Sequence, residues 1–214
     1  MEVSELNCHI LSSPTRGSKI HGQSKGLKTV AIIEVRSEEF VGLGEAYVGI
    51  YIPELTLKIV NHISSNIIGM DIETSMEKIR TFKAPFVSNA GIYKSILGSI
   101  EVALYDLQAR IKEIPLYKLF SNDAFFPSLY ASGGSVITSK RELDNDINLA
   151  KSKGLESFKM RIGKQSWKDD LNRVSHVRKH HQSMDLMVDA ISGTRNPVWS
   201  FDESLEYAKS LNIV

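Results

Sequence analysis

Apolar and polar positions follow two different patterns along the chain, and the first pattern covers its N-terminal part. Runs rich in β-branched and aromatic residues predict three strands, at residues 1–11, 29–36 and 40–46. Apolar residues at helical spacing then predict three helices, at residues 53–68, 72–83 and 92–112. Strands followed by helices are typical of an α+β domain, in which an antiparallel meander packs against the helices.

From residue 126 onward, a strand, a helix-capping signal and an amphipathic helix follow one another three times. The strands are predicted at residues 129–132, 157–162 and 185–190. Their helices are predicted to begin after the capping residues Ser139, Ser166 and Ser200. Such alternation predicts a parallel sheet, as in a βα barrel or a doubly wound fold. Three units are too few to close a barrel, so they predict either part of a barrel or a small α/β protein.

The second and third of these strands carry the candidate chemistry. In an extended strand residues i and i+2 share a face, so Lys159 and Arg161 are expected on one side and the apolar residues between them on the other. Asp189 is expected at the same end of the next strand. This trio suits a site in which Asp189 binds a hard cation such as Mg²⁺ and the two cationic side chains contact a carboxylate. A structural interpretation stays open, in which Lys159 and Arg161 extend into solvent and Asp189 caps a turn.

Composition and charge indicate a globular protein and argue against some classes of binding partner. The chain has 214 residues, 42% of them hydrophobic and 24% charged, which is typical of globular proteins with one large or two small domains. Its 26 basic and 25 acidic residues give a net charge of +1, which argues against a nucleic-acid or membrane-surface partner. Because the sequence has a lone Cys8 and no transmembrane or signal-peptide pattern, we expect a cytoplasmic protein.

Three further features are interpreted as structural. Gly42 and Gly44 do not form a dinucleotide fingerprint, because the third glycine and the immediate helix are missing. Their small size instead permits a bulge or close packing. Asp106 is expected to be a solvated or helix-capping acid. His180 and His181 are expected to end a helix, where a cation is favourable.

Several runs of the sequence resemble motifs of the enolase superfamily, specifically its mandelate racemase and muconate lactonizing enzyme branch. Residues 158–163, Phe-Lys-Met-Arg-Ile-Gly, resemble its Lys-x-Lys strand, and residues 186–190, Leu-Met-Val-Asp-Ala, resemble its Val-Asp-Ala-Asn strand. Further similar runs lie at residues 42–46, 99–107 and 115–120. The resemblance implies an α+β capping domain at residues 1–125, followed at residues 126–214 by the first three βα units of an incomplete (β/α)8 (TIM) barrel.

The resemblance also implies roles for the candidate residues. Lys159 matches the first lysine of the Lys-x-Lys motif, whereas Arg161 stands in place of the second lysine, which is often a base. Because arginine stays protonated at ordinary pH, Arg161 is expected to clamp an oxyanion or a carboxylate. Asp189 matches the first magnesium ligand, although Ile191 replaces the usual asparagine. In the family the other metal carboxylates and the opposite base come from later strands, so this chain is expected to be inactive alone.

The function that the resemblance implies is Mg²⁺-dependent abstraction of the proton next to a carboxylate. Arg161 in place of a base favours an acid-sugar or hydroxy-acid dehydratase, with a racemase, epimerase or cycloisomerase of the same superfamily as the alternative. A truncated, non-catalytic remnant is a further alternative. The expected partner is a small carboxylate substrate, an acid sugar or a hydroxy or amino acid, contacted by His21, Tyr47 and Tyr51. Full-length relatives are expected to be homo-oligomers.

Overall fold

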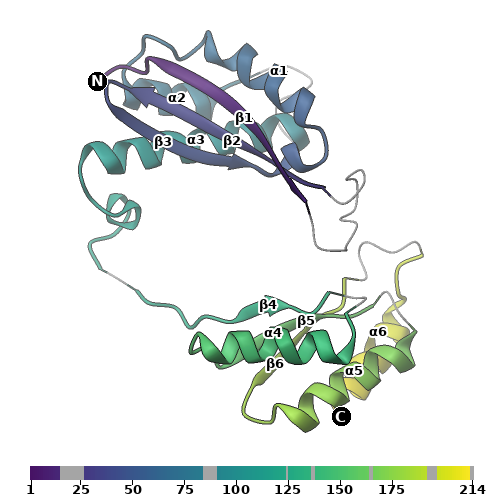
Figure 1. The fold of residues 1–214 in the computed structure, drawn as a ribbon. Coiled ribbons are helices and arrows are strands. Elements are labelled where there is room, and N and C mark those ends of the chain that lie inside the picture. The colour runs from purple at the N-terminus through teal and green to yellow at the C-terminus, as the bar shows by residue number, and fades with distance from the viewer. Residues whose placement is uncertain are drawn as a thin grey trace. The chain divides into compact units, whose positions relative to one another are not determined.

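The computed structural model describes residues 1–14, 27–83, 91–123, 125–135, 138–163, 166–191 and 197–212. The chain divides into two compact units, Met1–Ala124 and Phe125–Val214 (Figure 1). Each unit has a hydrophobic core of its own. None of the helices in the described ranges is both long enough and apolar enough to cross a membrane.

The first unit contains three antiparallel strands, hydrogen-bonded in the order β1-β2-β3. The strands are β1 (Glu5–Pro14), β2 (Leu27–Ser37) and β3 (Phe40–Ala46). The helices are α1 (Pro53–Ser64), α2 (Ile72–Thr81) and α3 (Gly91–Ile111), with short 3-10 helices η1 (Tyr47–Ile50) and η2 (Leu116–Leu119). The predicted meander and its three helices are therefore confirmed, and the unit is an α+β structure.

Several element ends differ from the sequence-based expectation, and the largest differences lie in β1 and α1. Strand β1 begins at Glu5 and not at Met1. Strand β1 continues to Pro14, which pairs with Leu27, although the residues after Leu11 show no apolar alternation. Helix α1 ends at Ser64, and Ile67 is buried from the turn that follows it. In both places the backbone hydrogen bonds determine where the element ends. The spacing of apolar residues in the sequence does not reveal these bonds.

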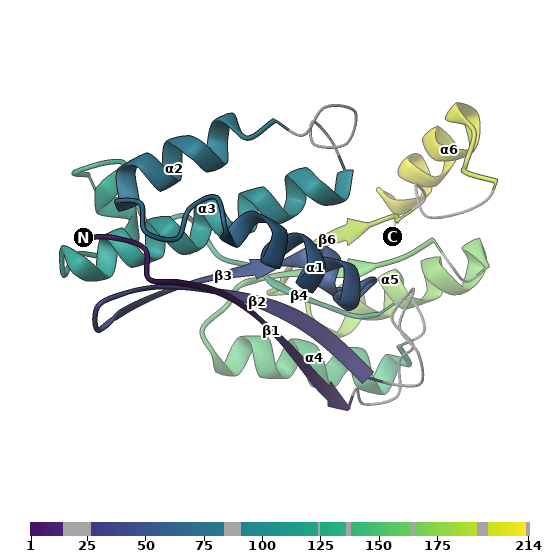
Figure 2. The same cartoon turned by 90° about the horizontal axis from the view of Figure 1, so that it is seen from above.

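One face of the first sheet carries the core. Alternate residues of β2, Ala31, Ile33 and Val35, are fully buried, as the two-residue period of a strand requires. They pack with the apolar stripe of α3, which includes Ile96 and Ile100. Figure 2 shows α1, α2 and α3 on the same side of the sheet. The core is thus one layer of helices on one face of the meander.

Two glycines allow β3 to lie directly against α3. A Cβ atom on Gly42 would overlap the carbonyl oxygen of Ala103, and a Cβ atom on Gly44 would overlap the carbonyl oxygen of Ser99. The close-packing interpretation of this Gly-x-Gly run is therefore confirmed.

Asp106 on α3 forms a second link between this helix and β3. Its Oδ2 accepts a hydrogen bond from the backbone N–H of Leu43 at 2.9 Å and another from Arg110 Nε at 2.9 Å. The expectation that Asp106 is only a solvated or helix-capping acid is therefore wrong. Its carboxylate binds the backbone of a strand that is distant in the sequence.

The second unit contains three parallel strands in the order β4-β5-β6. The strands are β4 (Ala131–Gly133), β5 (Ser157–Arg161) and β6 (Asp185–Asp189), and the helices are α4 (Lys140–Ser152), α5 (Trp167–His180) and α6 (Phe201–Leu211). The Ser139–Glu142 and Ser200–Glu203 capping boxes are both formed. The repeated βα pattern and the parallel sheet are confirmed. Strand β4, however, begins only at Ala131, after two exposed residues that were expected to belong to it.

Helices α4 and α5 cover one face of this sheet. Phe158 and Met160 of β5 are buried against Leu143 of α4 and Val174 of α5. Helix α6 differs, because no described residue of it is buried and Phe201, at the start of its expected apolar stripe, is 79% exposed. Its Leu211 packs partly buried against the core, and its Tyr207 stacks on Trp167, with ring centroids 3.9 Å apart.

Candidate functional site

The exposed face of the second sheet brings the predicted polar residues together. Lys159 and Arg161 of β5 lie on the face opposite the buried Phe158 and Met160, as the strand alternation predicts. In the register between strands, Arg161 pairs with Asp189 at the carboxyl end of β6. Two cations and one carboxylate therefore lie at the same end of two adjacent parallel strands.

Lys159 and Asp189 form an ion pair across the two strands. Lys159 Nζ lies 3.2 Å from Asp189 Oδ2, and each side chain is 32% exposed. The backbone N–H of Ile191 donates to Asp189 Oδ1 at 3.2 Å, so the carboxylate is also fixed from the loop behind it. Burial raises the pKa of the Asp189 carboxyl, but the Lys159 and Ile191 hydrogen bonds and the charges of Lys159 and Arg161 outweigh it. The pKa of Asp189 therefore lies below its ordinary value, and the side chain stays a carboxylate at neutral pH.

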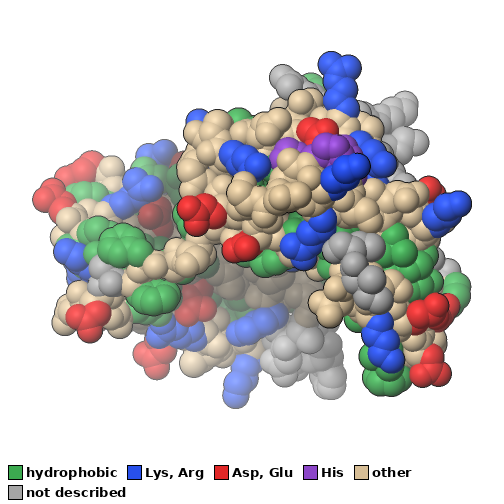
Figure 3. Space-filling model, turned by 90° about the horizontal axis from the view of Figure 1, so that it is seen from below, with side chains coloured by type: hydrophobic (Ala, Val, Ile, Leu, Met, Phe, Trp, Pro, Cys, Tyr) green, Lys and Arg blue, Asp and Glu red, His purple; other side chains and the backbone are tan. Residues whose placement is uncertain are grey.

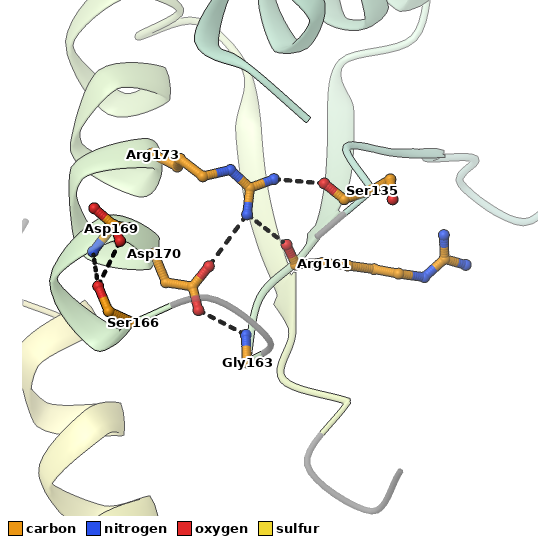
Figure 4. A network of polar contacts seen from close by, with 7 residues as sticks. All are labelled: Ser135, Arg161, Gly163, Ser166, Asp169, Asp170 and Arg173. Carbon is orange, nitrogen blue, oxygen red and sulfur yellow. Dashed lines mark hydrogen bonds and ion pairs between the residues drawn. The ribbon is translucent and has the colours of Figure 1, made fainter. Parts of the chain in front are cut away.

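A buried ion pair that the sequence reading missed lies behind this face. Asp170 is completely buried and Arg173 is 5% exposed, and Arg173 Nη1 donates to Asp170 Oδ1 at 3.2 Å (Figure 4). The other Asp170 oxygen, Oδ2, accepts the N–H of Gly163 at 2.8 Å. A signal was present in the sequence, because Asp170 stands four residues before Val174 on the apolar stripe of the predicted helix. A carboxylate at such a position needs a buried partner.

The predicted substrate contacts belong to the first unit. Tyr47 and Tyr51 lie together, with their hydroxyl oxygens 3.2 Å apart and their rings edge to face, and both side chains are exposed. The hydrogen bond to Tyr47 raises the pKa of the Tyr51 hydroxyl above its ordinary value. His21 lies outside the described residues. The substrate role of these three residues stays a prediction.

The described residues at the exposed face of the second sheet offer one candidate ligand for a metal ion, Asp189. Within the described ranges no group of three His, Cys, Asp or Glu side chains could hold a metal ion. Mg²⁺ prefers an octahedron of oxygen ligands, of which Asp189 offers one carboxylate. At the position of the expected asparagine, Ile191 contributes a backbone N–H and no side-chain ligand. Asp189 is therefore a suitable ligand for Mg²⁺, but the described residues do not form a complete Mg²⁺ site.

A second polar cluster joins α4 and α5, and one of its members, His181, follows α5 directly. Asp144 Oδ1 accepts hydrogen bonds from His176 Nε2 at 2.9 Å and from His181 Nε2 at 2.8 Å. Lys151 Nζ lies 3.4 Å from His181 Nδ1. Figure 3 shows histidine side chains grouped on the surface beside lysine and arginine side chains. The expectation that His181 only ends a helix is corrected, because its ring is 7% exposed and binds Asp144.

Comparison with known proteins gives a family match. Residues 9–121, more than half of the chain, match the model described as mandelate racemase / muconate lactonizing enzyme, N-terminal domain.

Two curated enzymes align with nearly the whole chain. The chain is 26% identical over 204 residues to 3,6-anhydro-alpha-L-galactonate cycloisomerase from Streptomyces coelicolor, and the alignment covers 92% of this chain and 55% of that enzyme. It is also 26% identical over 216 residues to L-talarate/galactarate dehydratase from Salmonella typhimurium, covering 94% of this chain and 51% of that enzyme. The chain thus spans about half the length of the curated relatives it matches.

The fold is similar to that of solved structures. A racemase from Streptomyces coelicolor A3(2), crystallised with bound magnesium, superposes with a TM-score of 0.79 at 21% identity. This superposition covers 98% of this chain and 59% of that protein. The likeness extends through both units and concerns the fold.

Proposed function

The chain belongs to the mandelate racemase and muconate lactonizing enzyme family, and from this premise we propose that it carries the carboxylate-binding side of a proton-abstraction site. The reaction proposed is that of an acid-sugar or hydroxy-acid dehydratase. The observation that carries the proposal is the Lys159–Asp189 ion pair, with Arg161 beside it, on the exposed face at the carboxyl ends of two parallel strands.

Each of the three residues has a proposed role. Asp189 is one ligand of Mg²⁺, and its pKa below the ordinary value keeps it in the charged form that a metal requires. When bound, Mg²⁺ would stabilise negative charge on the substrate carboxylate. Lys159 and Arg161 donate hydrogen bonds to the substrate's anionic oxygens, and the guanidinium fork suits a carboxylate in a bidentate contact.

The choice of a dehydratase rests on the side chain at position 161. Racemisation requires a competent base on each face of the α-carbon, whereas elimination of a β-hydroxyl requires proton removal from one face. Arg161 remains protonated and cannot act as one of two bases. The similarity to a dehydratase that acts on talarate and galactarate supports the same choice.

The parallel sheet of the second unit is proposed to be the first part of a βα barrel, because its strands place their polar residues at one common edge. The remaining oxygen ligands and the base opposite Lys159 are proposed to come from outside the described residues. Cycloisomerase chemistry is the second candidate, because a cycloisomerase aligns with 92% of the chain.

The first test measures ligand binding by NMR. We expect Mg²⁺ to shift the side-chain signals of Asp189, and galactarate added after Mg²⁺ to shift those of Lys159 and Arg161. Arg178→Met, which removes an exposed guanidinium from α5, should respond like the native protein. Galactarate that leaves Lys159 and Arg161 unchanged in the presence of Mg²⁺ would contradict the proposed site.

The second test follows the substrate α-proton in deuterated water, in a full-length version of the enzyme that also contains the later barrel strands. The dehydratase proposal predicts deuterium entry from one face only, coupled to loss of water, and predicts that Arg161→Lys loses dehydration. Comparable deuterium entry into both enantiomers of an unreactive analogue would show two bases and favour a racemase. Mg²⁺ binding without any exchange would favour the non-catalytic alternative.

A further inference from the structure

The buried pair of Asp170 and Arg173 contacts the backbone where β4 and β5 end. Arg173 Nη2 donates to the carbonyl of Ser135 at 2.7 Å, and Nη1 donates to the carbonyl of Arg161 at 3.2 Å (Figure 4). Asp170 Oδ2 accepts the N–H of Gly163 at 2.8 Å. One ion pair on α5 therefore holds three backbone groups that belong to two neighbouring strand exits.

The residues held by these contacts lie on either side of a hydrogen bond between the end of β5 and the end of β6. Arg161 and Gly163, whose backbone the pair holds, flank Ile162, and the N–H of Ile162 donates to the carbonyl of Asp189 at 2.9 Å. The backbone of Asp189 is thus fixed to the segment that Asp170 and Arg173 hold. The Arg161 side chain points away from Arg173 in Figure 4, so the pair acts on the Arg161 backbone and leaves its guanidinium free to face outward.

The packing at Gly163 restricts the backbone conformation of residues 161–163. Gly163 has a φ of 98°, a backbone conformation that disfavours other residues. A Cβ atom there would also lie 2.7 Å from the carbonyl oxygen of Ala190, directly after Asp189. The turn after β5 and the end of β6 are therefore in direct backbone contact, and a shift in one displaces the other.

We propose that Asp170 and Arg173 are positioning residues, which set the placement of Arg161 and Asp189 at the candidate site through the backbone of residues 161–163. This inference rests on the proposed function for its link to Mg²⁺ and substrate. The contacts themselves do not depend on that function. A buried ion pair is a poor source of stability, since apolar residues of similar volume often replace it without loss. A role in fixing geometry accounts better for a pair with three backbone partners.

The test compares local and global effects by amide hydrogen exchange. Arg173→Lys keeps the charge but loses the planar fork that joins the two carbonyls. The double variant Asp170→Leu with Arg173→Met keeps the buried volume and removes every hydrogen bond of the pair. Arg178→Met, on the exposed side of the same helix, is the control.

In both test variants we expect the amides of Ile162 and Gly163 to exchange roughly tenfold faster or more, while Phe158 and Met160 in the strand interior keep their native rates. The control should exchange like the native protein. Unchanged rates at Ile162 and Gly163, or a uniform increase along β5, would overturn the proposal, because the pair would then have no local effect.

Mg²⁺ alone provides the second readout. Residues that orient a metal ligand affect affinity, so the Mg²⁺ dissociation constant should rise about tenfold in Arg173→Lys and stay constant in Arg178→Met. An Mg²⁺ affinity that Arg173→Lys leaves unchanged would overturn the positioning of Asp189. If the native chain binds no Mg²⁺, the proposal that Asp189 alone is enough for measurable binding fails, and the exchange experiment decides whether Asp170 and Arg173 position the backbone.

Discussion

The ammonium group of Lys159 reaches diagonally across the sheet to Asp189, and the two charged groups lie 3.2 Å apart although Lys159 is in register with Met187. The metal ion that is proposed to bind Asp189 would therefore meet a carboxylate that already has a cationic neighbour.

Asp189→Ala should abolish any stabilisation of the protein by Mg²⁺. A ligand that binds only the folded state stabilises it, by about 2.7 kcal/mol when its concentration is one hundred times the dissociation constant. Thermal unfolding with and without Mg²⁺ measures this effect. Asp185→Ala removes the carboxylate at the opposite end of the same strand and should keep the full Mg²⁺ response. An undiminished Mg²⁺ response in Asp189→Ala would remove Asp189 from the site.

Lys159→Met should strengthen Mg²⁺ binding severalfold, because the ammonium group repels a second cation at the same carboxylate. The side chain is partly exposed, so added salt should reduce the difference between native and variant proteins. Titration with Mg²⁺ at low and high salt measures both effects. Weaker Mg²⁺ binding in Lys159→Met would mean that Lys159 orients Asp189 rather than competing with the metal.

Asp106→Ala should destabilise the first unit by about 1 kcal/mol, because the N–H of Leu43 loses its hydrogen-bond acceptor. Arg110→Ala removes the exposed ion pair on the same carboxylate and should cost less than about 0.5 kcal/mol. Chemical denaturation of the two variants gives the comparison. Equal costs would show that the bond between β3 and α3 contributes nothing beyond the exposed ion pair.

Gly42→Ala should destabilise the protein by about 1–3 kcal/mol, because the added methyl group overlaps the backbone of α3. The matched control is Gly98→Ala within α3, where a Cβ atom meets nothing within 4 Å. It should stabilise the helix by up to about 1 kcal/mol. Denaturation midpoints measure both changes, and a neutral Gly42→Ala would refute the close contact.

The Asp144 carboxylate should cause the free energy of unfolding to decrease at acidic pH. Burial raises its pKa, but the hydrogen bonds and charges of His181 and His176 outweigh burial, so the pKa of Asp144 lies below its ordinary value. A carboxyl whose pKa is lowered by folding adds stability above its ordinary pKa and loses it as pH falls through the lowered value.

The free energy of unfolding should therefore decrease less in Asp144→Asn than in the native protein between about pH 5 and pH 2. Urea denaturation at several pH values measures this difference. His62→Gln, which removes an exposed histidine from the end of α1, is the control and should follow the native curve. Parallel curves for Asp144→Asn and the native protein would contradict the role of the cluster.

Local patterns predicted much of the fold and the face on which the candidate site lies. Alternation in residues 158–162 placed Lys159 and Arg161 opposite the buried positions, because strand geometry alone decides this. The capping boxes at Ser139 and Ser200 marked helix starts, because both partners lie within one turn.

Contacts between distant segments could not be predicted in this way. The pairing of Asp144 with His176 and His181 depends on how α4 and α5 pack, and no local pattern reports that packing. The exposed Phe201 had the periodicity of a core residue, but periodicity shows which residues share a helix face without showing that the face is covered. For the same reason the partners of Asp170 could not be predicted. Its position on the apolar stripe indicated that it is buried, but not which residues it contacts.

The aromatic cluster at α6 also determines which part of the chain tryptophan fluorescence reports. The only two tryptophans of the sequence, Trp167 and Trp199, both lie in the second unit, with ring centroids 6.2 Å apart. Indole fluorescence consequently reports the unfolding of the second unit alone, while far-ultraviolet circular dichroism reports both. Recording the two signals on one sample gives the order in which the units unfold, without a label or a separately expressed fragment.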